Sequence, residues 1–325
     1  MTSPNRTLRA RTPEDVLAVV PVVLGFVPTD SVVMLTFGAA SPFHARIDLP
    51  DDAGQVPHAS AALVAPAVRH GVERVVLVIY SRDPLRAREA FAELAAGFEG
   101  ARIAVAEALL ADGRCWFPLL PGRPAATYAG VPYDVSHHPL SVQAVVDGRV
   151  THASREALAA TLAGVGAAEI DRVRAEVGQR PELDDDQRAA EGSWVRAQVR
   201  QWVVTGEVPA PAALARLLVA LTDIGLRDVA WLLMSRADAA RHVDWWVQVV
   251  RRAPGELAAA PAALLAFAAW LAGEGALAWC AVDRSRESDP DYRLAELVAQ
   301  ALTHAVPPST WEPVDESELP APDPA

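Results

Sequence analysis

The sequence contains no lysine, because all 29 of its basic residues are arginine. Without a lysine amine there is no Schiff base, no phosphate-binding lysine of a P-loop and no kinase-type lysine clamp. The formal net charge is −12, so the chain also lacks the basic surface with which proteins grip phosphates. We therefore expect no direct nucleic-acid partner.

Cysteine is also scarce, with only Cys115 and Cys280 in 325 residues. Two thiols so far apart do not make the disulfide framework of a secreted protein, so we expect a cytoplasmic protein. Hydrophobic residues make up 51% of the chain, which is enough for a large core. At this length, that core indicates two domains rather than one.

No segment is expected to enter a membrane. The apolar run 16–27 resembles the core of a signal peptide, but Glu14 and Asp15 precede it where basic residues belong. The uncharged run 257–273 is close to the shortest length that spans a bilayer. Its high alanine content favours a buried helix instead.

The first 150 residues alternate helices and strands, which predicts an α/β domain with a mixed sheet flanked by helices. Thr12 can cap a helix that begins with proline and two acidic residues. The run 75–79 is apolar throughout, as in a strand buried on both faces. The expected strands are 31–37, 43–49, 74–80, 102–110 and 114–118; the expected helices are 13–24, 56–70 and 84–98; 119–139 is expected to be a surface loop.

Residues 151–305 are expected to form a purely helical domain. Eight of the nine tryptophans lie after residue 190, amid alanine and leucine, which suits close helix packing better than a ligand cage. The expected helices are 154–164, 184–205, 211–224, 226–236, 238–252, 257–272, 275–286 and 292–304. Residues 306–325 combine five acidic residues with many prolines and no basic residue, which predicts a disordered tail.

The last helices resemble one tetratricopeptide unit. The matching positions are Leu265, Ala266, Ala269, Ala278 and Pro290. No clean preceding copy is found, so both a repeat array and a simple helical hairpin stay open.

One group of polar residues could line a pocket at an edge of the predicted sheet. Arg46 and Asp48 are two apart on a strand and so share one face. Ligands in open α/β sheets often lie beyond the carboxyl ends of strands, where further polar residues are expected. These candidates for ligand binding are Asp30, Ser31, Arg46, Asp48, Ser81 and Arg82. The alternative interpretation is structural: turn and capping residues, with an ion pair between Arg46 and Asp48.

Other chemistry finds little support. Asp134, His137, His138 and His152 include zinc-ligand types, but adjacent histidines in a loop lack the spacing that aims two rings at one ion. There is no Gly-x-Ser-x-Gly elbow for a hydrolase serine. Cys115, beside a tryptophan on a strand, is expected to be packed rather than nucleophilic. No catalytic residue, metal or cofactor is predicted.

Short motifs lie at 15–26, 28–33, 45–50, 76–80, 112–116, 130–139 and 263–292. Together they resemble an actinobacterial family, domain of unknown function 4192, and the resemblance runs from about residue 8 to residue 308. The resemblance implies a cytoplasmic bacterial protein and brings no catalytic residue. Members often carry cysteines after the Gly-Arg-x-Trp strand, but residues 117–124 have none here, so no metal or redox role is expected.

Together these observations favour a non-catalytic protein-interaction or regulatory module whose helical half binds another protein. The alternative is an enzyme or small-ligand-binding protein that uses the polar group around Arg46 and Asp48.

Overall fold

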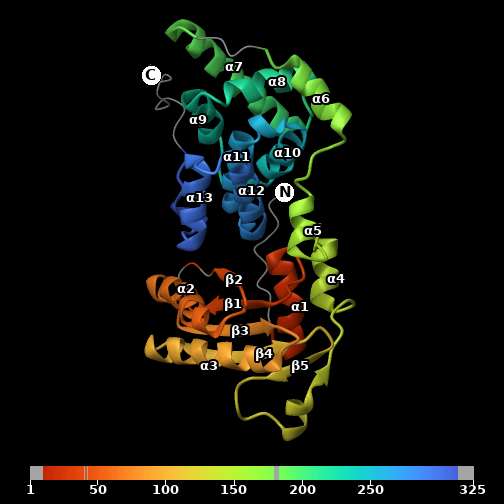
Figure 1. Cartoon of the computed structure of the whole chain (residues 1–325), viewed down its shortest axis with the longest axis vertical. Helices are drawn as coiled ribbons and strands as arrows, with labels where there is room; N and C mark the ends of the chain where they lie inside the picture. Colours follow the sequence, from red (N-terminus) through yellow and green to blue (C-terminus); the bar gives the residue numbers. More distant parts are fainter. Residues whose placement is uncertain (1–9, 40, 42, 179–182, 314–325) are drawn as a thin grey trace. The chain divides into compact units, whose positions relative to one another are not determined.

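Strands and helices separate along the chain, as the sequence predicts. The structure is a computed structural model and describes residues 10–39, 41, 43–178 and 183–313. The chain divides into two units, Met1–Arg155 and Glu156–Ala325, which Figure 1 colours in sequence order. The first unit contains a mixed sheet with helices, and the described part of the second contains helices and no strand. The expected fold class is therefore confirmed.

The sheet of the first unit has six strands in the order β2-β1-β3-β4-β5-β6. Only β3 and β4 run parallel, and every other pair of neighbours is antiparallel. The apolar run at 75–79 lies in β3, in the middle of the sheet, with both of its faces covered. The strands are β1 (Ser31–Phe37), β2 (His44–Asp48), β3 (Arg74–Tyr80), β4 (Ala104–Ala111), β5 (Cys115–Pro118) and β6 (Val131–Pro132).

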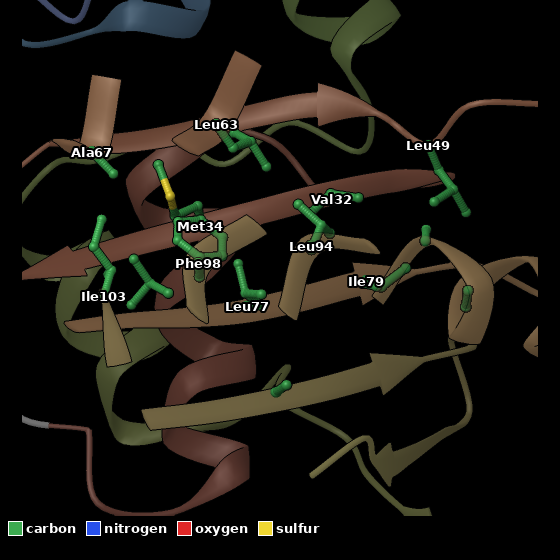
Figure 2. Close-up of a cluster of buried hydrophobic side chains, with 14 of the residues drawn as sticks. Val32, Met34, Leu49, Leu63, Ala67, Leu77, Ile79, Leu94, Phe98 and Ile103 are labelled. Atoms are coloured by element: carbon green, nitrogen blue, oxygen red, sulfur yellow. The ribbon is translucent and has the colours of Figure 1, made fainter. Parts of the chain in front are cut away.

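Helices cover both faces of this sheet. On one face, α2 (Val56–Arg69) and α3 (Pro84–Gly100) supply side chains such as Leu63, Leu94 and Phe98 to a buried apolar cluster. Figure 2 shows these side chains gathered against Met34 and other strand residues. On the other face, α1 (Pro13–Leu24) packs through its valines and Leu17. Covering on both faces explains why β3 needs no polar side chain between its ends.

Helix α1 begins where its sequence predicts. The Thr12 hydroxyl accepts the Asp15 N–H, and the Asp15 carboxylate accepts the Thr12 N–H in return. This reciprocal cap satisfies two donors that a helix start otherwise leaves free. The helix continues through Pro21 and ends at Gly25, whose φ of 77° is left-handed and suits glycine.

The segment after β5 contains more regular structure than the expected loop. Within it lie a short 3-10 helix, Ala125–Ala129, and the two-residue strand β6, which pairs with Cys115 and Trp116 of β5. Helix α4 (Pro139–Val146) follows and is also missed by the sequence-based prediction. A strand of two residues has no periodicity of its own, so only its partner strand defines it.

The second unit is built from nine helices in its described part. They are α5 (Arg155–Ala160), α6 (Ala167–Glu176), α7 (Asp185–Thr205), α8 (Pro211–Ala220), α9 (Ile224–Leu232), α10 (Ala239–Arg252), α11 (Ala259–Ala272), α12 (Gly275–Ser288) and α13 (Arg293–Thr303). Helix α6 is not expected from the sequence. The uncharged run at 257–273 becomes α11, in which every residue from 259 to 271 is buried. No described helix is long and apolar enough to cross a membrane.

The tryptophans of this unit pack against one another and against aliphatic side chains. Trp245 and Trp246 are fully buried on α10, and Trp202 of α7 stacks on Trp245 at 5.8 Å between ring centroids. The expectation of a packed role for these rings therefore agrees with the structure. Helices α11 and α12 form a tight hairpin that turns at Gly273. A hairpin fits either interpretation of these helices, so a tetratricopeptide repeat stays a prediction.

The expectation of a disordered tail from residue 306 is wrong for its first part. Residues 306–313 lie against the helical unit, and Trp311 stacks on Trp231 at 5.5 Å. One tryptophan buries enough apolar surface to order a short segment that composition alone marks as disordered. The rest of the predicted tail, 314–325, lies outside the described residues.

The central strand gives a direct test of the first unit. Leu77 of β3 is fully buried, so Leu77→Ala should lower the free energy of unfolding by about 2–5 kcal/mol. Leu85→Ala is the matched control, because Leu85 is 73% exposed and should cost less than about 0.5 kcal/mol. Native-state hydrogen exchange of the β1 and β3 amides measures the free energy of unfolding of both variants. Tryptophan fluorescence is unsuitable, because most tryptophans report on the other unit. If the two variants lowered the free energy of unfolding equally, the assignment of Leu77 to the core would be contradicted.

Candidate functional site

The polar residues that the sequence groups together do meet at one edge of the sheet. Strand register places Ser31 directly opposite Asp48 of β2 on one side and Tyr80 of β3 on the other. Arg46 is paired with Val33, two residues along the same face of β1 and β2. Ser81 follows the last residue of β3. The start of β1 and the ends of β2 and β3 therefore bring these candidates to the same end of the sheet.

Contacts within the protein already engage Arg46. Its Nε donates to the Ser31 hydroxyl at 2.9 Å, and its terminal nitrogen lies 2.7 Å from an Asp48 oxygen. The guanidinium also lies over the Phe26 ring, 5.9 Å from the centroid. Ser31 is fully buried, and its hydroxyl donates to the Thr29 carbonyl. Arg46 thus joins two strands and the segment that enters β1.

The other candidates at this edge lie in turns, and one of these turns leads into the helix cap formed by Asp83. The Ser81 hydroxyl accepts the Asp83 N–H at 3.1 Å, and the Asp83 carboxylate accepts the first N–H groups of α3. Asp30 is exposed with a φ of 39°, and its carbonyl accepts the Leu49 N–H. Arg82 is exposed. This geometry matches the structural interpretation better than a ligand site.

Two neighbouring residues at this edge are not singled out by the sequence. Arg86 of α3 donates to the carbonyls of Leu49 and Pro50 and pairs with Asp51 at 2.8 Å, which ties α3 to the end of β2. The Tyr80 hydroxyl is buried without a hydrogen-bond partner among the described residues. Burial also raises the pKa of Tyr80 far above its ordinary value, so the phenol stays protonated. A single arginine or tyrosine carries no sequence signal for either arrangement.

The residues considered for zinc are spread over separate structural roles. His138 caps α4 by accepting the Leu140 N–H, and its Nε2 lies 3.2 Å from an Asp15 oxygen of α1. Asp134 accepts the Ser136 N–H. The backbone of His152 pairs with the residues around Phe26. No three metal-ligating side chains gather anywhere in the part of the chain that the structure covers.

A hollow of about 390 Å³ lies in the helical unit between the end of α7 and α10, and we call it the α7–α10 hollow. Helix α7 ends at Gly206, which takes a left-handed φ of 70°. The Trp245 indole donates to the Glu207 carbonyl at 3.0 Å and so fixes the following loop to α10. The lining residues are Val203, Val204, Thr205, Gly206, Val208, Arg241, Asp244, Trp245 and Gln248.

The α7–α10 hollow combines exposed apolar side chains with charges that have no partner in the described structure. Val204 is 70% exposed, and Val208 also faces solvent. Arg241 and Asp244 stand one turn apart on α10, and neither side chain forms a hydrogen bond or ion pair within the described residues. Partial burial raises the pKa of Asp244, because its surroundings penalise the charged carboxylate. A cation brought by a ligand would relieve that penalty.

Comparison with known families identifies the chain. The model of a family described as domain of unknown function (DUF4192) matches residues 13–309. The chain belongs to this family. No curated protein and no solved structure matches it. For a DUF4192 chain, the interpretation of the site therefore depends on its own geometry.

Nothing in the sequence of this DUF4192 chain indicates the α7–α10 hollow. Its walls come from residues near 205 and near 245, and the valines of the first wall look like ordinary helix residues in the sequence. The exposure of Val204 at the end of α7 does point to the hollow, but it is visible in the structure and not in the sequence. That signal becomes informative only when the second wall is known.

Arg46 should behave as a structural residue. Arg46→Ala leaves the buried Ser31 hydroxyl without its donor and should lower the free energy of unfolding by about 1 kcal/mol. Asp48→Ala is the control, because the Asp48 side chain is 84% exposed and its ion pair should contribute less than about 0.5 kcal/mol. Hydrogen exchange of the β1 amides compares the two variants. A larger loss from Asp48→Ala would show that the ion pair, not the serine contact, holds this edge.

Asp15 makes the start of α1 sensitive to acid. Hydrogen bonds from the backbone N–H groups of Arg11 and Thr12, together with nearby His138, lower the pKa of Asp15. A lowered folded pKa stabilises the fold above the ordinary carboxyl pKa of about 4, and this stabilisation is lost as pH falls through the lowered value. Asp15→Asn should therefore be less stable than the wild type at about pH 6, with the difference shrinking towards pH 3. Denaturant unfolding across that pH range measures it, and a constant difference would argue against the carboxylate as the cause.

Proposed function

We propose that this protein is a non-catalytic interaction module whose helical unit binds a segment of a basic partner protein in the α7–α10 hollow. The observation that carries the proposal is the exposed valine wall of the hollow next to the exposed Asp244, whose carboxylate has no partner among the described residues. Exposed apolar side chains rimmed by polar ones are typical of protein-binding surfaces. A volume of about 390 Å³ accommodates a few side chains of a partner.

Charge favours a basic partner. Residues 156–325 contain 26 acidic residues and 15 arginines, a balance of −11 out of the total of −12. The field of this unit therefore attracts positive segments and repels acidic ones. Asp244 supplies the local contact for an arginine or lysine, and Val204 and Val208 supply the contact for an apolar neighbour on the same segment.

The proposal includes a cytoplasmic location and no direct contact with nucleic acid. Both cysteines are free thiols, which suits a reducing compartment. The acidic balance weakens any contact with phosphates. The alternative, a small ligand at the sheet edge, has less support because Arg46 already engages Ser31 and Asp48.

Selection of peptides from a random displayed library on the immobilised full-length protein tests this function. We expect enriched peptides to carry a large apolar residue close to an arginine or lysine. Val204→Asp and Asp244→Asn should each weaken binding of a selected peptide about tenfold or more, measured by fluorescence polarisation.

Two control variants change the same residue types elsewhere. Val150→Asp alters an exposed valine of the first unit, and Asp186→Asn alters an exposed carboxylate in the first turn of α7. Both should bind the selected peptide as the wild type does. Two results would contradict the proposal. The selected peptides could be acidic, or they could bind Val204→Asp and Asp244→Asn as strongly as they bind the wild type.

A further inference from the structure

A second surface of the helical unit is already occupied by a segment of the same chain. Residues 306–313, here called the strap, follow the end of α13 and contain the 3-10 turn Pro308–Thr310. The Trp311 ring stacks on Trp231 at 5.5 Å with an interplanar angle of 22°. Its edge meets Phe267 of α11 at 4.8 Å and 78°. One indole thus fits between two aromatic rings of the body.

Two indole N–H groups fix the two ends of the strap. Trp311 donates to the Met234 carbonyl at 2.9 Å, and Trp270 of α11 donates to the Val306 carbonyl at 3.0 Å. Trp231, Met234, Phe267 and Trp270 together form what we call the aromatic slot. No charged side chain of the described structure bridges the strap and the slot, so rings and two hydrogen bonds provide the recognition.

The strap is peripheral, whereas most of the slot beneath it is core. Met234, Phe267 and Trp270 are buried, but no residue from 303 to 313 is, and Trp311 itself is half-buried. Hydrogen bonds within the strap, from the N–H groups of Thr310 and Trp311 to Pro307 and Pro308, shape it locally. The strap therefore has a conformation of its own and contacts the body through Trp311 and the Val306 carbonyl.

We propose that the aromatic slot is an exchangeable docking site for a tryptophan-bearing, proline-flanked segment of a partner protein. In the isolated chain the strap fills the slot and acts as an autoinhibitory contact. Because the strap is tethered, its effective concentration at the slot is high. To replace it, a partner segment must bind the slot more tightly than the untethered strap peptide would. This site is distinct from the α7–α10 hollow, and the two proposals stand or fall separately.

Charge indicates which segment would compete best. The strap carries Glu312 next to its tryptophan, although the residues onto which it docks, 156–305, already contain 21 acidic residues and 15 arginines, a balance of −6. An acidic residue at that position is repelled by the unit's field, whereas a basic one is attracted. The favoured partner segment therefore has the tryptophan and prolines of the strap, with arginine or lysine where the strap has glutamate.

A synthetic peptide with the sequence of residues 306–313 tests the slot directly. We expect the labelled peptide to bind the full-length Trp311→Ala variant saturably, and to bind the wild type at least tenfold more weakly because the strap competes. The peptide in which alanine replaces tryptophan should bind neither protein. A peptide carrying the Glu312→Arg change should bind Trp311→Ala more tightly, and this gain should shrink with added salt.

Trp194→Ala is the matched control variant. Trp194 is another half-exposed tryptophan of the same unit, lying under Arg216 at 3.9 Å, and its removal does not open the slot. This variant should bind the strap peptide no better than the wild type. Val204→Asp combined with Trp311→Ala should bind it as Trp311→Ala does, which separates this result from the α7–α10 hollow.

A second variant keeps the test decisive if Trp311→Ala does not fold. A protease site inserted between Ala305 and Val306 lets the strap be cut from an otherwise wild-type body. After cleavage, the labelled peptide should replace the released strap. Failure of the peptide to bind folded Trp311→Ala, or to exchange into the cleaved protein, would overturn the proposal and make the strap a fixed part of the core.

Discussion

The helical unit depends on covering one helix that has no polar side. Helix α11 consists of alanine, leucine, proline, phenylalanine and tryptophan, and only its last residue is not buried. Exposing such a helix to water costs free energy, so other elements must cover it on all sides. Helices α10, α12 and α13 pack around it, and the strap covers the part that carries Phe267 and Trp270. Alanine lets these neighbours approach closely, and the tryptophans fill the remaining space.

The first unit is stabilised differently. Helices cover both faces of its sheet, whereas arginine side chains connect the elements at its edge. Arg46 links β2 to the buried Ser31, and Arg86 links α3 to the carbonyls that follow β2. A planar guanidinium presents several donors in fixed directions and can satisfy more than one acceptor at once. In a chain without lysine, the cations that could bind a ligand at this edge are arginines, and Arg46 and Arg86 are already engaged in contacts within the protein.

What could be predicted from the sequence follows from local signals. The apolar run at 75–79 defines a central strand by itself, and the turn that the Ser81 hydroxyl forms also depends only on its neighbours. Strand β6 and helix α6 carry weak local patterns, so packing decides them and the sequence does not predict them. The two proposed binding surfaces join distant segments: Trp311 binds a carbonyl 77 residues earlier, and the α7–α10 hollow has walls from two separate helices. Composition predicts disorder for the strap because it averages over residues, whereas one aromatic ring in a matching slot orders this segment.

In the two proposed binding surfaces, charge and apolar contact would play different parts. The acidic balance of the helical unit acts over a distance of about 10 Å at moderate ionic strength, so it affects how often a basic segment arrives. Valine contacts in the hollow and ring contacts in the slot are short-range, so they would affect the dissociation rate of a bound segment. A surface that attracts by charge and retains by apolar contact is what the proposed reversible binding of a protein segment requires. At the sheet edge, by contrast, the polar groups are turned towards one another, since Arg46 engages both Ser31 and Asp48.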